Sequence, residues 1–400
     1  MTISRDHGGT TIGVCDAIVV GAGIVGASCA HALAKAGLAV RIVERDAPAR
    51  GTSGACEGNL VLWDRTSDPD LALTRVSHRR WAELAEELSA GVGIDIEYAR
   101  KGSLMVIPES GGIDGARRQC DWLGGQGVRY EWLDAAGVRE AEPWLKGAVD
   151  GAAYFPDDAQ IEPRLATWAQ VRAAQRCGAT LHAHQPVLDV QSSATGVRVT
   201  TGLGVLSADW LVVAAGVWSP EVVRSLHVDV PVRPRKGQIA IIAGSPVQVI
   251  HKVMEASYVQ TVASDDEQLQ VANVVESTRS GSILLGSSRE VTVPSDRGVE
   301  LSVLSRIVAR ALDFFPDLAS AQVIRSYAGL RPMTPDHLPL IGPLREHPRV
   351  ILATGHEGGG VMGAAATADM VAALIMGAPT PVPPEPYLPT RTLNPAGSHG

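Results

Sequence analysis

The feature that most constrains this chain is a glycine-rich turn between an apolar run and a helical segment. Residues 16–21 (DAIVVG) have the apolar character and length of a strand buried on both faces. The motif GAGIVG, residues 21–26, follows at once, and a helix is predicted over residues 24–36, ended by Gly37. A second strand is predicted at residues 38–44, which completes a βαβ unit with a right-handed crossover. The sequence therefore predicts a Rossmann-like α/β fold.

The three glycines of this GxGxxG motif predict a dinucleotide site. Gly21 allows the tight turn, Gly23 lets the backbone approach a pyrophosphate, and Gly26 lets the helix pack close to the strand. The helix N-terminus, at Ile24 and Val25, offers N–H groups and a positive dipole end to phosphates. The alternative is a purely structural glycine turn.

An acidic residue at the end of the second predicted strand extends the same interpretation. Glu44 lies 23 residues after Gly21, is followed by Arg45, and can accept both hydroxyl hydrogens of an adenosine ribose. Its charge would repel a 2′-phosphate, so NADP is disfavoured. The motif by itself leaves NAD and FAD open.

Charge and cysteine content narrow the class of protein. With 400 residues, 45% of them apolar, the chain is long enough to bury a core. Its net charge of −8 argues against a broad surface for nucleic acid or an anionic membrane. The five cysteines are scattered, which predicts no metal site, disulfide framework or iron–sulfur cluster. The first fifteen residues have no apolar leader segment, and the apolar stretch 17–30 is too short to span a bilayer. We expect a cytoplasmic protein without a membrane span.

Further along the chain the pattern alternates between helical and β-rich stretches. One helix is predicted to begin at Pro69 with Asp68 as N-cap, and another to run from Pro163 to Gly178. Short strands at 180–183, 187–191 and 197–201 are expected to form hairpins that lead into a buried strand at 205–216. A further helix is predicted near residues 300–312, a strand at 350–354, then a helix to residue 376 and a proline-rich tail over the surface.

These stretches suggest two domains, one of them discontinuous. The expected strands nearest the glycine motif come from both ends of the chain, and a β-rich region lies between them. We predict a Rossmann-like nucleotide-binding domain formed by residues 1–90, 151–228 and 325–400. The inserted β-rich (α+β) substrate domain is predicted to comprise residues 91–150 and 229–324.

Longer segments of the chain resemble one known family. They are residues 16–46, 51–59 (GTSGACEGN), 211–219 (LVVAAGVWS), 327–343 (YAGLRPMTPDHLPLIGP) and 353–375 (ATGHEGGGVMGAAATADMVAALI). In this order they resemble the D-amino acid oxidase superfamily of flavoproteins over nearly the whole chain, in its glycine oxidase and sarcosine oxidase branch. The resemblance is strongest to the FAD-carrying β subunits of heteromeric amine dehydrogenases, such as hydrogen cyanide synthase, opine oxidase and D-hydroxyproline dehydrogenase.

The resemblance implies FAD as the cofactor and assigns further residues to it. Gly51, Thr52 and Ser53 are implied to run past the pyrophosphate and ribityl chain, and Val187 to offer its backbone to the adenine. Ala215 and Gly216 are implied to end a strand beside the cofactor. The residues implied to face the flavin ring are Gly329, Arg331, His356, Glu357, Gly358, Gly359 and Gly360. Monomeric sarcosine oxidases bond flavin through a cysteine in the segment that reads AGLRPMTPD here. That cysteine is missing, so noncovalent FAD is expected.

Two residues are implied to act on substrate. Arg331 matches the arginine that binds the substrate carboxylate in amino acid and glycine oxidases, and a guanidinium can grip a carboxylate through two hydrogen bonds. Tyr258, expected on a strand, resembles the tyrosine that donates its hydroxyl to the same carboxylate. The alternatives are structural roles: an ion pair of Arg331 with Asp336, and a half-buried position on a strand for Tyr258. Lys236 is expected to be structural.

The implied activity is oxidation of the C–N bond of a small amino acid or secondary amine acid to an imine, with flavin accepting the hydride. Candidate substrates are glycine, sarcosine, D-amino acids, D-hydroxyproline and opines. The electron acceptor is oxygen or a partner: the relatives use a second flavoprotein chain, often an iron–sulfur chain, and sometimes an FMN between subunits. The alternatives are a flavin-binding relay subunit without a substrate and a tRNA-modifying oxidase, which the net charge of −8 disfavours.

Overall fold

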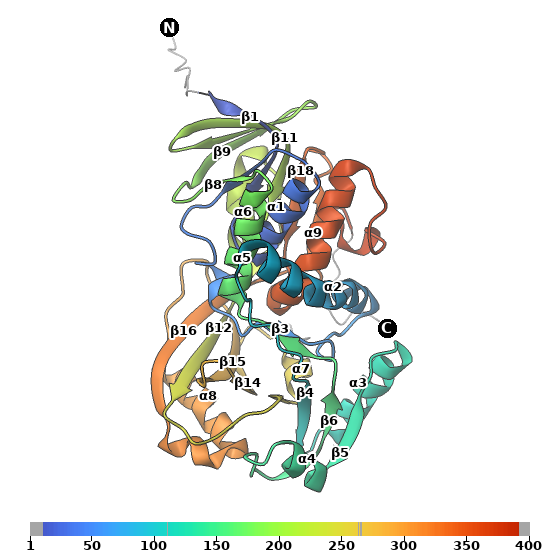
Figure 1. Ribbon diagram of the computed structural model, residues 1–400, viewed down its shortest axis with the longest axis vertical. Coiled ribbons are helices and arrows are strands. Elements are labelled where there is room, and N and C mark those ends of the chain that lie inside the picture. The colour runs from blue at the N-terminus through green and yellow to red at the C-terminus, as the bar shows by residue number, and fades with distance from the viewer. Residues whose placement is uncertain (1–10, 110, 263, 265, 392–400) are drawn as a thin grey trace.

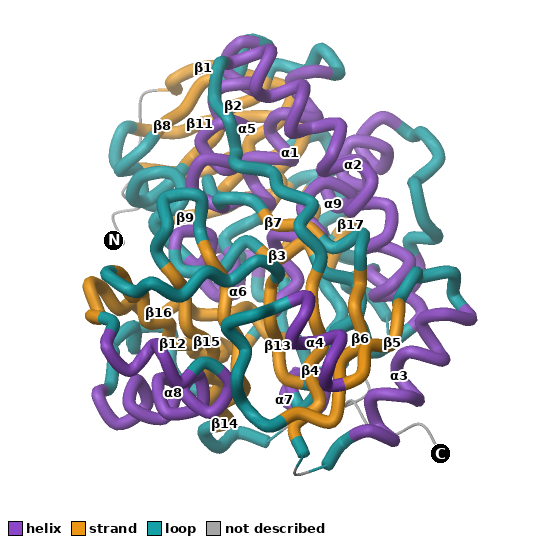
Figure 2. Tube along the Cα trace, turned by 60° about the horizontal axis from the view of Figure 1, so that its bottom comes forward, coloured by secondary structure: helices purple, strands orange, loops and turns teal. Residues whose placement is uncertain are grey.

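The computed structural model describes residues 11–391 except 110, 263 and 265, and this part contains two eight-stranded sheets. Figure 1 shows them at opposite ends of the long axis, with a group of helices beside the first sheet. Figure 2, seen from a tilted direction, shows the same division, with the short strands β3 (Asn59–Leu60) and β7 (Ala159–Gln160) between the two parts.

The first sheet is parallel at its centre. β1 (Thr11–Val20) lies between β11 (Gly204–Val213) and β2 (Val40–Val43), and β1 pairs with both in parallel. β18 (Val350–Thr354) extends the parallel arrangement beyond β11, as the predicted strand at 350–354 requires. The Rossmann-like class of the fold is therefore confirmed.

The prediction that residues 180–183 form part of a hairpin is wrong. β8 (Thr180–His182) pairs in parallel with β2, because α5 (Pro163–Arg176) carries the chain back across the sheet before β8 begins. The next two strands, β9 (Val187–Ser192) and β10 (Val197–Thr201), do form the antiparallel arrangement expected with β11. The sheet is completed by β17 (Leu340–Pro343), antiparallel to β18.

Four helices pack beside the first sheet. α1 (Ile24–Lys35) contacts both α5 and α9 (Gly360–Met376), and α9 also contacts α2 (Asp68–Val92). Most buried residues of α1 are small (Gly26, Ala27, Ser28, Cys29, Ala30 and Ala34), which lets its neighbours approach closely. The N-cap of α2 is Ser67, whose hydroxyl accepts from the Asp70 N–H, and not Asp68 as predicted, because the helix begins one residue earlier.

Over the described part of the chain, one helical stretch, Glu357–Met376, is long and apolar enough by length and composition to cross a membrane. It packs against α1 and α2, and most of its side chains from Val361 to Val371 are buried. Burial in the core therefore accounts for its apolar composition.

The second sheet has the order β16-β12-β15-β14-β13-β4-β6-β5. The bounds of its strands are β4 (Ser103–Pro108), β5 (Glu131–Asp134), β6 (Val149–Phe155), β12 (Arg233–Ala243), β13 (Lys252–Glu255), β14 (Gln270–Ser277), β15 (Ile283–Val291) and β16 (Gln322–Met333). α8 (Leu301–Phe314), the helix predicted near residues 300–312, packs its apolar side against this sheet. The remaining helices on this part are α3 (Ile113–Gly125), α4 (Ala135–Ala141) and α7 (Tyr258–Val262).

The division into two domains stays a prediction, and two of its boundaries fall inside strands of the second sheet. Residue 151 lies within β6, and residue 325 lies within β16.

The proline-rich tail is not confined to the surface as expected. Tyr387 is 1% exposed, and its hydroxyl donates to the Pro69 carbonyl at 2.6 Å. The aromatic ring anchors this end of the described chain beside α2 because burying it removes a large apolar area from water.

Candidate active site

A cavity of about 330 Å³ extends from the carboxyl ends of β1, β2 and β11 to the facing ends of β12 and β16. Ligands of open α/β sheets bind at such strand ends. Nearly all residues that the sequence assigned to a site line this cavity: Gly21, Gly23, Ile24, Val25, Glu44, Arg45, Gly51, Thr52, Ser53, Val187, Ala215, Gly216, Tyr258, Gly329, Arg331, His356, Glu357, Gly358 and Gly360. Gly26 and Gly359 are not on its wall.

The glycine turn after β1 brings backbone to the cavity wall. Gly21 has a φ of +105°, and a Cβ there would lie 2.5 Å from the Ala214 carbonyl oxygen. Gly26 sits behind the turn, where a Cβ would collide with the Gly21 carbonyl. The N–H of Ile24, expected to be available to phosphates, donates instead to Ser53 Oγ at 2.9 Å. The serine therefore fixes the start of α1.

Glu44 ties the glycine turn to the end of β2. Its Oε2 accepts from the Ala22 N–H at 2.7 Å, and its Oε1 accepts from the Asp46 N–H at 2.9 Å. These bonds fix the carboxylate on the cavity wall with further lone pairs available to hydroxyl groups. Beside it the Arg45 guanidinium lies 3.7 Å from the centre of the Trp218 ring. Trp218 lines the cavity and was missed, because a tryptophan in a loop has no sequence signal of its own.

The opposite end of the cavity is closed by the turn before α9. α9 begins at Gly360, after a 3₁₀ turn at Glu357–Gly359, and ends at Met376 as predicted. His356 is buried, bonded through Nε2 to Thr367 Oγ1 at 2.8 Å, and burial lowers its pKa to about 4. Gly359 faces a second, smaller cavity, where a Cβ would lie 2.7 Å from Arg65 Nη1.

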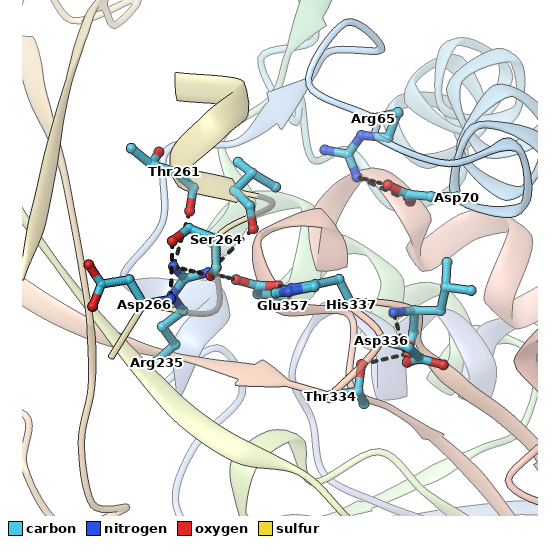
Figure 3. A network of polar contacts seen from close by, with 12 residues as sticks. Arg65, Asp70, Arg235, Thr261, Ser264, Asp266, Thr334, Asp336, His337 and Glu357 are labelled. Atoms are coloured by element: carbon cyan, nitrogen blue, oxygen red, sulfur yellow. Dashed lines mark hydrogen bonds and ion pairs between the residues drawn. The ribbon is translucent and has the colours of Figure 1, made fainter. Parts of the chain in front are cut away.

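Glu357 is the centre of a buried polar network (Figure 3). Its Oε1 accepts from Arg235 Nη1 at 2.7 Å, and its Oε2 bonds to His337 Nδ1 at 2.7 Å. Burial alone would raise the pKa of Glu357, but His337 and Arg235 outweigh it and hold that pKa at about 2. Arg235 also donates to the carbonyls of Thr261 and Ser264, so the network joins β12 to the segment after α7.

Arg331 presents a guanidinium without a carboxylate partner. It projects from β16 beside Gly237 of β12, where a Cβ would collide with it, and its Nη1 donates to the Ser288 carbonyl at 2.9 Å. Within the described residues no carboxylate lies within 4.0 Å of it, and Asp336 pairs instead with Arg391. Burial and the neighbouring Arg289 lower the pKa of Arg331. The group is a partly buried cation on the cavity wall.

Tyr258 lies in α7 and not on a strand as predicted. β13 ends at Glu255, and the chain then turns, with the Thr261 N–H donating back to the Ser257 carbonyl at 3.2 Å. The tyrosine ring is buried against Trp63, and the guanidinium of Arg289 lies 4.2 Å from its centre. Arg289 is 2% exposed and, in the part of the chain described, also lacks a carboxylate within 4.0 Å. Arg331 lines this cavity, whereas Arg289 lines the smaller neighbouring one, and Tyr258 lies on the wall of both.

A group of charged residues to which the sequence gave no role completes this end. Glu57, in the loop before β3, lines the cavity and is 8% exposed. Lys252 of β13 is held by Glu276 and Asn59 and lies 3.5 Å from Glu57 Oε2. Lys236, expected to be structural, pairs on the other side of β12 with Glu290, Asp296 and Glu300.

The fold and this cavity define a nucleotide-dependent oxidoreductase of the α/β class. The family model of FAD dependent oxidoreductases, DAO, matches residues 16–374, and the chain belongs to this family. The resemblance that the sequence suggested is confirmed, and so is FAD as the cofactor.

Individual relatives match over nearly their whole length. Glycine oxidase of Bacillus licheniformis is 29% identical over 91% of this chain and 94% of its own. Hydrogen cyanide synthase subunit HcnC of Pseudomonas aeruginosa is 27% identical over 94% of this chain and 96% of its own. The crystal structure of glycine oxidase from Geobacillus kaustophilus superimposes with a TM-score of 0.87 at 28% identity, covering 95% of this chain and all of that one.

Proposed function

We propose that this FAD dependent oxidoreductase oxidises the C–N bond of a small amino acid or secondary amine acid to an imine, which water then hydrolyses. The names of its relatives support an amino acid substrate. The observation that carries the proposal is the guanidinium of Arg331, partly buried on the cavity wall without a carboxylate partner in the described structure. A cation out of water needs a counter-charge, and a substrate carboxylate supplies one.

The residues along the cavity fit an FAD bound from the first sheet to the second. Glu44 would accept the ribose hydroxyls, and Gly21 and Gly23 would let the pyrophosphate lie against backbone. The segment 356–358 and Gly360 would face the flavin ring. Bound FAD supplies the hydride acceptor. The chain supplies the rest: it binds the carboxylate through Arg331 and Tyr258 and so orients the substrate.

Noncovalent attachment of FAD is supported by the segment 328–336, which carries Arg331 on the cavity wall and contains no cysteine. The one cysteine on the cavity wall, Cys56, donates its thiol to the Ser53 carbonyl, and burial raises its pKa to about 12. A thiol this far from ionising is a poor nucleophile at neutral pH.

A second candidate is a dehydrogenase subunit that passes electrons to a partner chain. It is favoured by the match to a hydrogen cyanide synthase subunit over most of both chains. In this version a partner flavoprotein and an iron–sulfur chain accept the electrons, and an FMN can lie between subunits. A cytoplasmic location is part of the proposal and fits the five free cysteines.

The test is a substrate panel on the purified FAD-containing chain without oxygen. Glycine, sarcosine, D-amino acids, D-hydroxyproline and opines are added singly, and bleaching of the flavin absorbance is followed. Rapid bleaching by at least one of them is expected. If dithionite reduces the flavin and no amine acid does, the chain is a relay subunit and the proposal fails.

A further inference from the structure

We propose that Glu57 binds the amine of the substrate and makes the site selective for amine-bearing carboxylates. This inference rests on the proposed function and deepens it, because it assigns the second handle of the substrate to a named side chain. The observations are the burial of Glu57, the direction of its free oxygen and the opposite charge of the neighbouring Arg331.

The first observation is that one carboxylate oxygen is fully used and the other is not. Glu57 Oε2 accepts from Asn59 Nδ2 at 2.9 Å and lies 3.5 Å from Lys252 Nζ. Oε1 accepts no hydrogen bond from the described residues and lies directly against Gly286 of β15, where any Cβ would collide with it. Glu57 is 8% exposed and lines the cavity. A carboxylate oxygen without a donor on a cavity wall can accept a hydrogen bond from an N–H group.

The second observation is that Glu57 is held as an anion. Burial alone would raise its pKa, but Lys252, Asn59 and Arg331 outweigh this effect, and the pKa is lowered overall. Lys252 is itself shared with Glu276, which is fully buried on β14. The largest of these effects comes from Lys252, which does not line the cavity, so the charge on Glu57 does not depend on a ligand.

The third observation is charge complementarity across the same strand. The guanidinium of Arg331 is bonded to the carbonyl of Ser288, and Glu57 lies against Gly286, two residues earlier on β15. The wall therefore offers a cation to a carboxylate and, close by, an anion to an amine. An α-amino acid or N-alkyl amino acid satisfies both, whereas a simple carboxylic acid has no N–H to donate to Glu57 Oε1, and a 2-hydroxy acid offers only a neutral hydroxyl.

The experiment compares an amino acid with its desamino acid, the same molecule with hydrogen in place of the amine. The amino acid is the one that reduces the wild-type flavin fastest, and its dissociation constant comes from the concentration dependence of anaerobic reduction. The desamino acid cannot be oxidised, and its binding is read from the change in flavin absorbance. In the wild type the amino acid should bind more tightly than the desamino acid.

Glu57→Gln keeps the shape of the side chain and removes its charge. It should weaken binding of the amino acid about tenfold or more, the effect of losing one charge-assisted hydrogen bond, and change binding of the desamino acid less than threefold. Glu57→Asp, which keeps the charge, should show an intermediate loss. It also provides the comparison if Glu57→Gln does not retain FAD.

The matched control is Glu276→Gln, which removes the other buried carboxylate on Lys252 and does not line the cavity. It should change the binding of both ligands by the same factor. The inference is overturned if Glu57→Gln leaves the preference for the amino acid unchanged, or if Glu276→Gln lowers that preference equally. Failure of the proposed function is a separate result, since the wild-type flavin would then not be reduced by any amine acid.

Discussion

Arg331 and Glu44 mark the two ends of the cavity, and their side chains are held in position by different interactions. Glu44 is fixed by two backbone N–H groups, so its position follows from the local turn. Among the described residues the Arg331 guanidinium has one hydrogen-bond acceptor, the Ser288 carbonyl, which leaves its other donors available to a ligand. Glu44 is therefore held by the fold itself, whereas Arg331 keeps hydrogen-bond donors that can bind an anionic ligand.

Arg331→Ala should abolish most of the affinity for a carboxylated substrate and affect FAD content far less. The loss of one charged hydrogen bond, about 1.5–3 kcal/mol, corresponds to roughly ten- to a hundredfold weaker binding, and loss of both bonds of a bidentate pair weakens it further. The dissociation constant is measured by anaerobic flavin reduction. Arg325→Ala, an exposed arginine on the same strand, is the control and should behave as wild type. Undiminished binding in the Arg331 variant would remove it from the site.

Glu44→Arg should weaken FAD binding. It removes two acceptors for backbone N–H groups and puts a cation beside the N-terminal end of α1, where the dipole is positive. The measurement is the ratio of flavin to protein absorbance after gel filtration. Glu86→Arg makes the same charge change on the exposed side of α2 and should retain its flavin. Equal flavin in both variants would show that Glu44 does not contribute.

At the scale of elements, the pairing of β12 with β16 determines whether the guanidinium of Arg331 fits between these strands and the cavity. Gly237 and Gly329 lie opposite each other in the register of these strands, so this position of the ladder has no side chains. The guanidinium fills the space beside Gly237, while a Cβ at Gly329 would lie 2.8 Å from the Ala55 carbonyl oxygen. The strands β12 and β16 and the loop at Ala55, which follows β2 of the first sheet, can approach this closely because Gly237 and Gly329 have no side chains.

Gly237→Ala should therefore displace Arg331 and lower affinity for the substrate carboxylate, with FAD still bound. A Cβ cannot fit without moving the guanidinium, so the loss should approach that of Arg331→Ala. Dissociation constants from anaerobic reduction give the comparison. Gly91→Ala, in open space on α2, serves as the control. A Gly237→Ala variant that binds substrate as tightly as wild type would contradict this packing argument.

A second element-scale feature gives a pH dependence. Asp158, just before β7, accepts from Ser103 Oγ at 2.6 Å and from the Leu62 N–H at 3.1 Å. Burial raises its pKa from an ordinary value of 3.8 to about 7. Between these two values the folded chain keeps a proton that the unfolded chain releases. This group therefore makes the fold less stable as pH rises from 4 to 7, with no further change above.

Asp158→Asn should remove that contribution. The melting temperature of the variant, relative to wild type, should rise when the pH is raised from 5 to 7.5, because the amide has no proton to lose. Thermal unfolding of both proteins at the two pH values measures this difference. A difference that stays constant, or falls, would show that Asp158 does not titrate in this range.

At the scale of the whole molecule, the flavin must pass its electrons to oxygen or to a docked protein. The relatives include both glycine oxidases and a subunit of hydrogen cyanide synthase. In the described part of the chain no group of three or more His, Cys, Asp or Glu side chains is arranged to hold a metal ion. An internal relay through such a group is therefore not available in that part.

We expect the isolated chain to be reduced by substrate and reoxidised slowly by air, with an artificial dye restoring turnover. The comparison is the rate of peroxide formation against the rate of dye reduction at one substrate concentration. Dye-linked turnover should be the faster of the two by at least tenfold. Comparable rates would identify a self-sufficient oxidase and count against partner subunits.

What the sequence determined by itself are features that depend on short spacing along the chain. The turn at residues 21–26, the placement of Glu44 and the start of α5 at Pro163 follow from local backbone requirements and hydrogen bonds. Recognisable segments also located Arg331, because its neighbours in the sequence resemble those of a known family.

Only the tertiary structure decided which distant side chains meet. The charge of Glu57 is stabilised by Lys252, which is nearly two hundred residues away in the sequence. Its Oε1 has room only because Gly286 has no side chain. Tyr258 was expected on a strand because β-rich sequence surrounds it, yet the short β13 ends before it and the chain turns into α7. Electrostatic partners and strand ends are set by packing between elements, and no local pattern of residues encodes them.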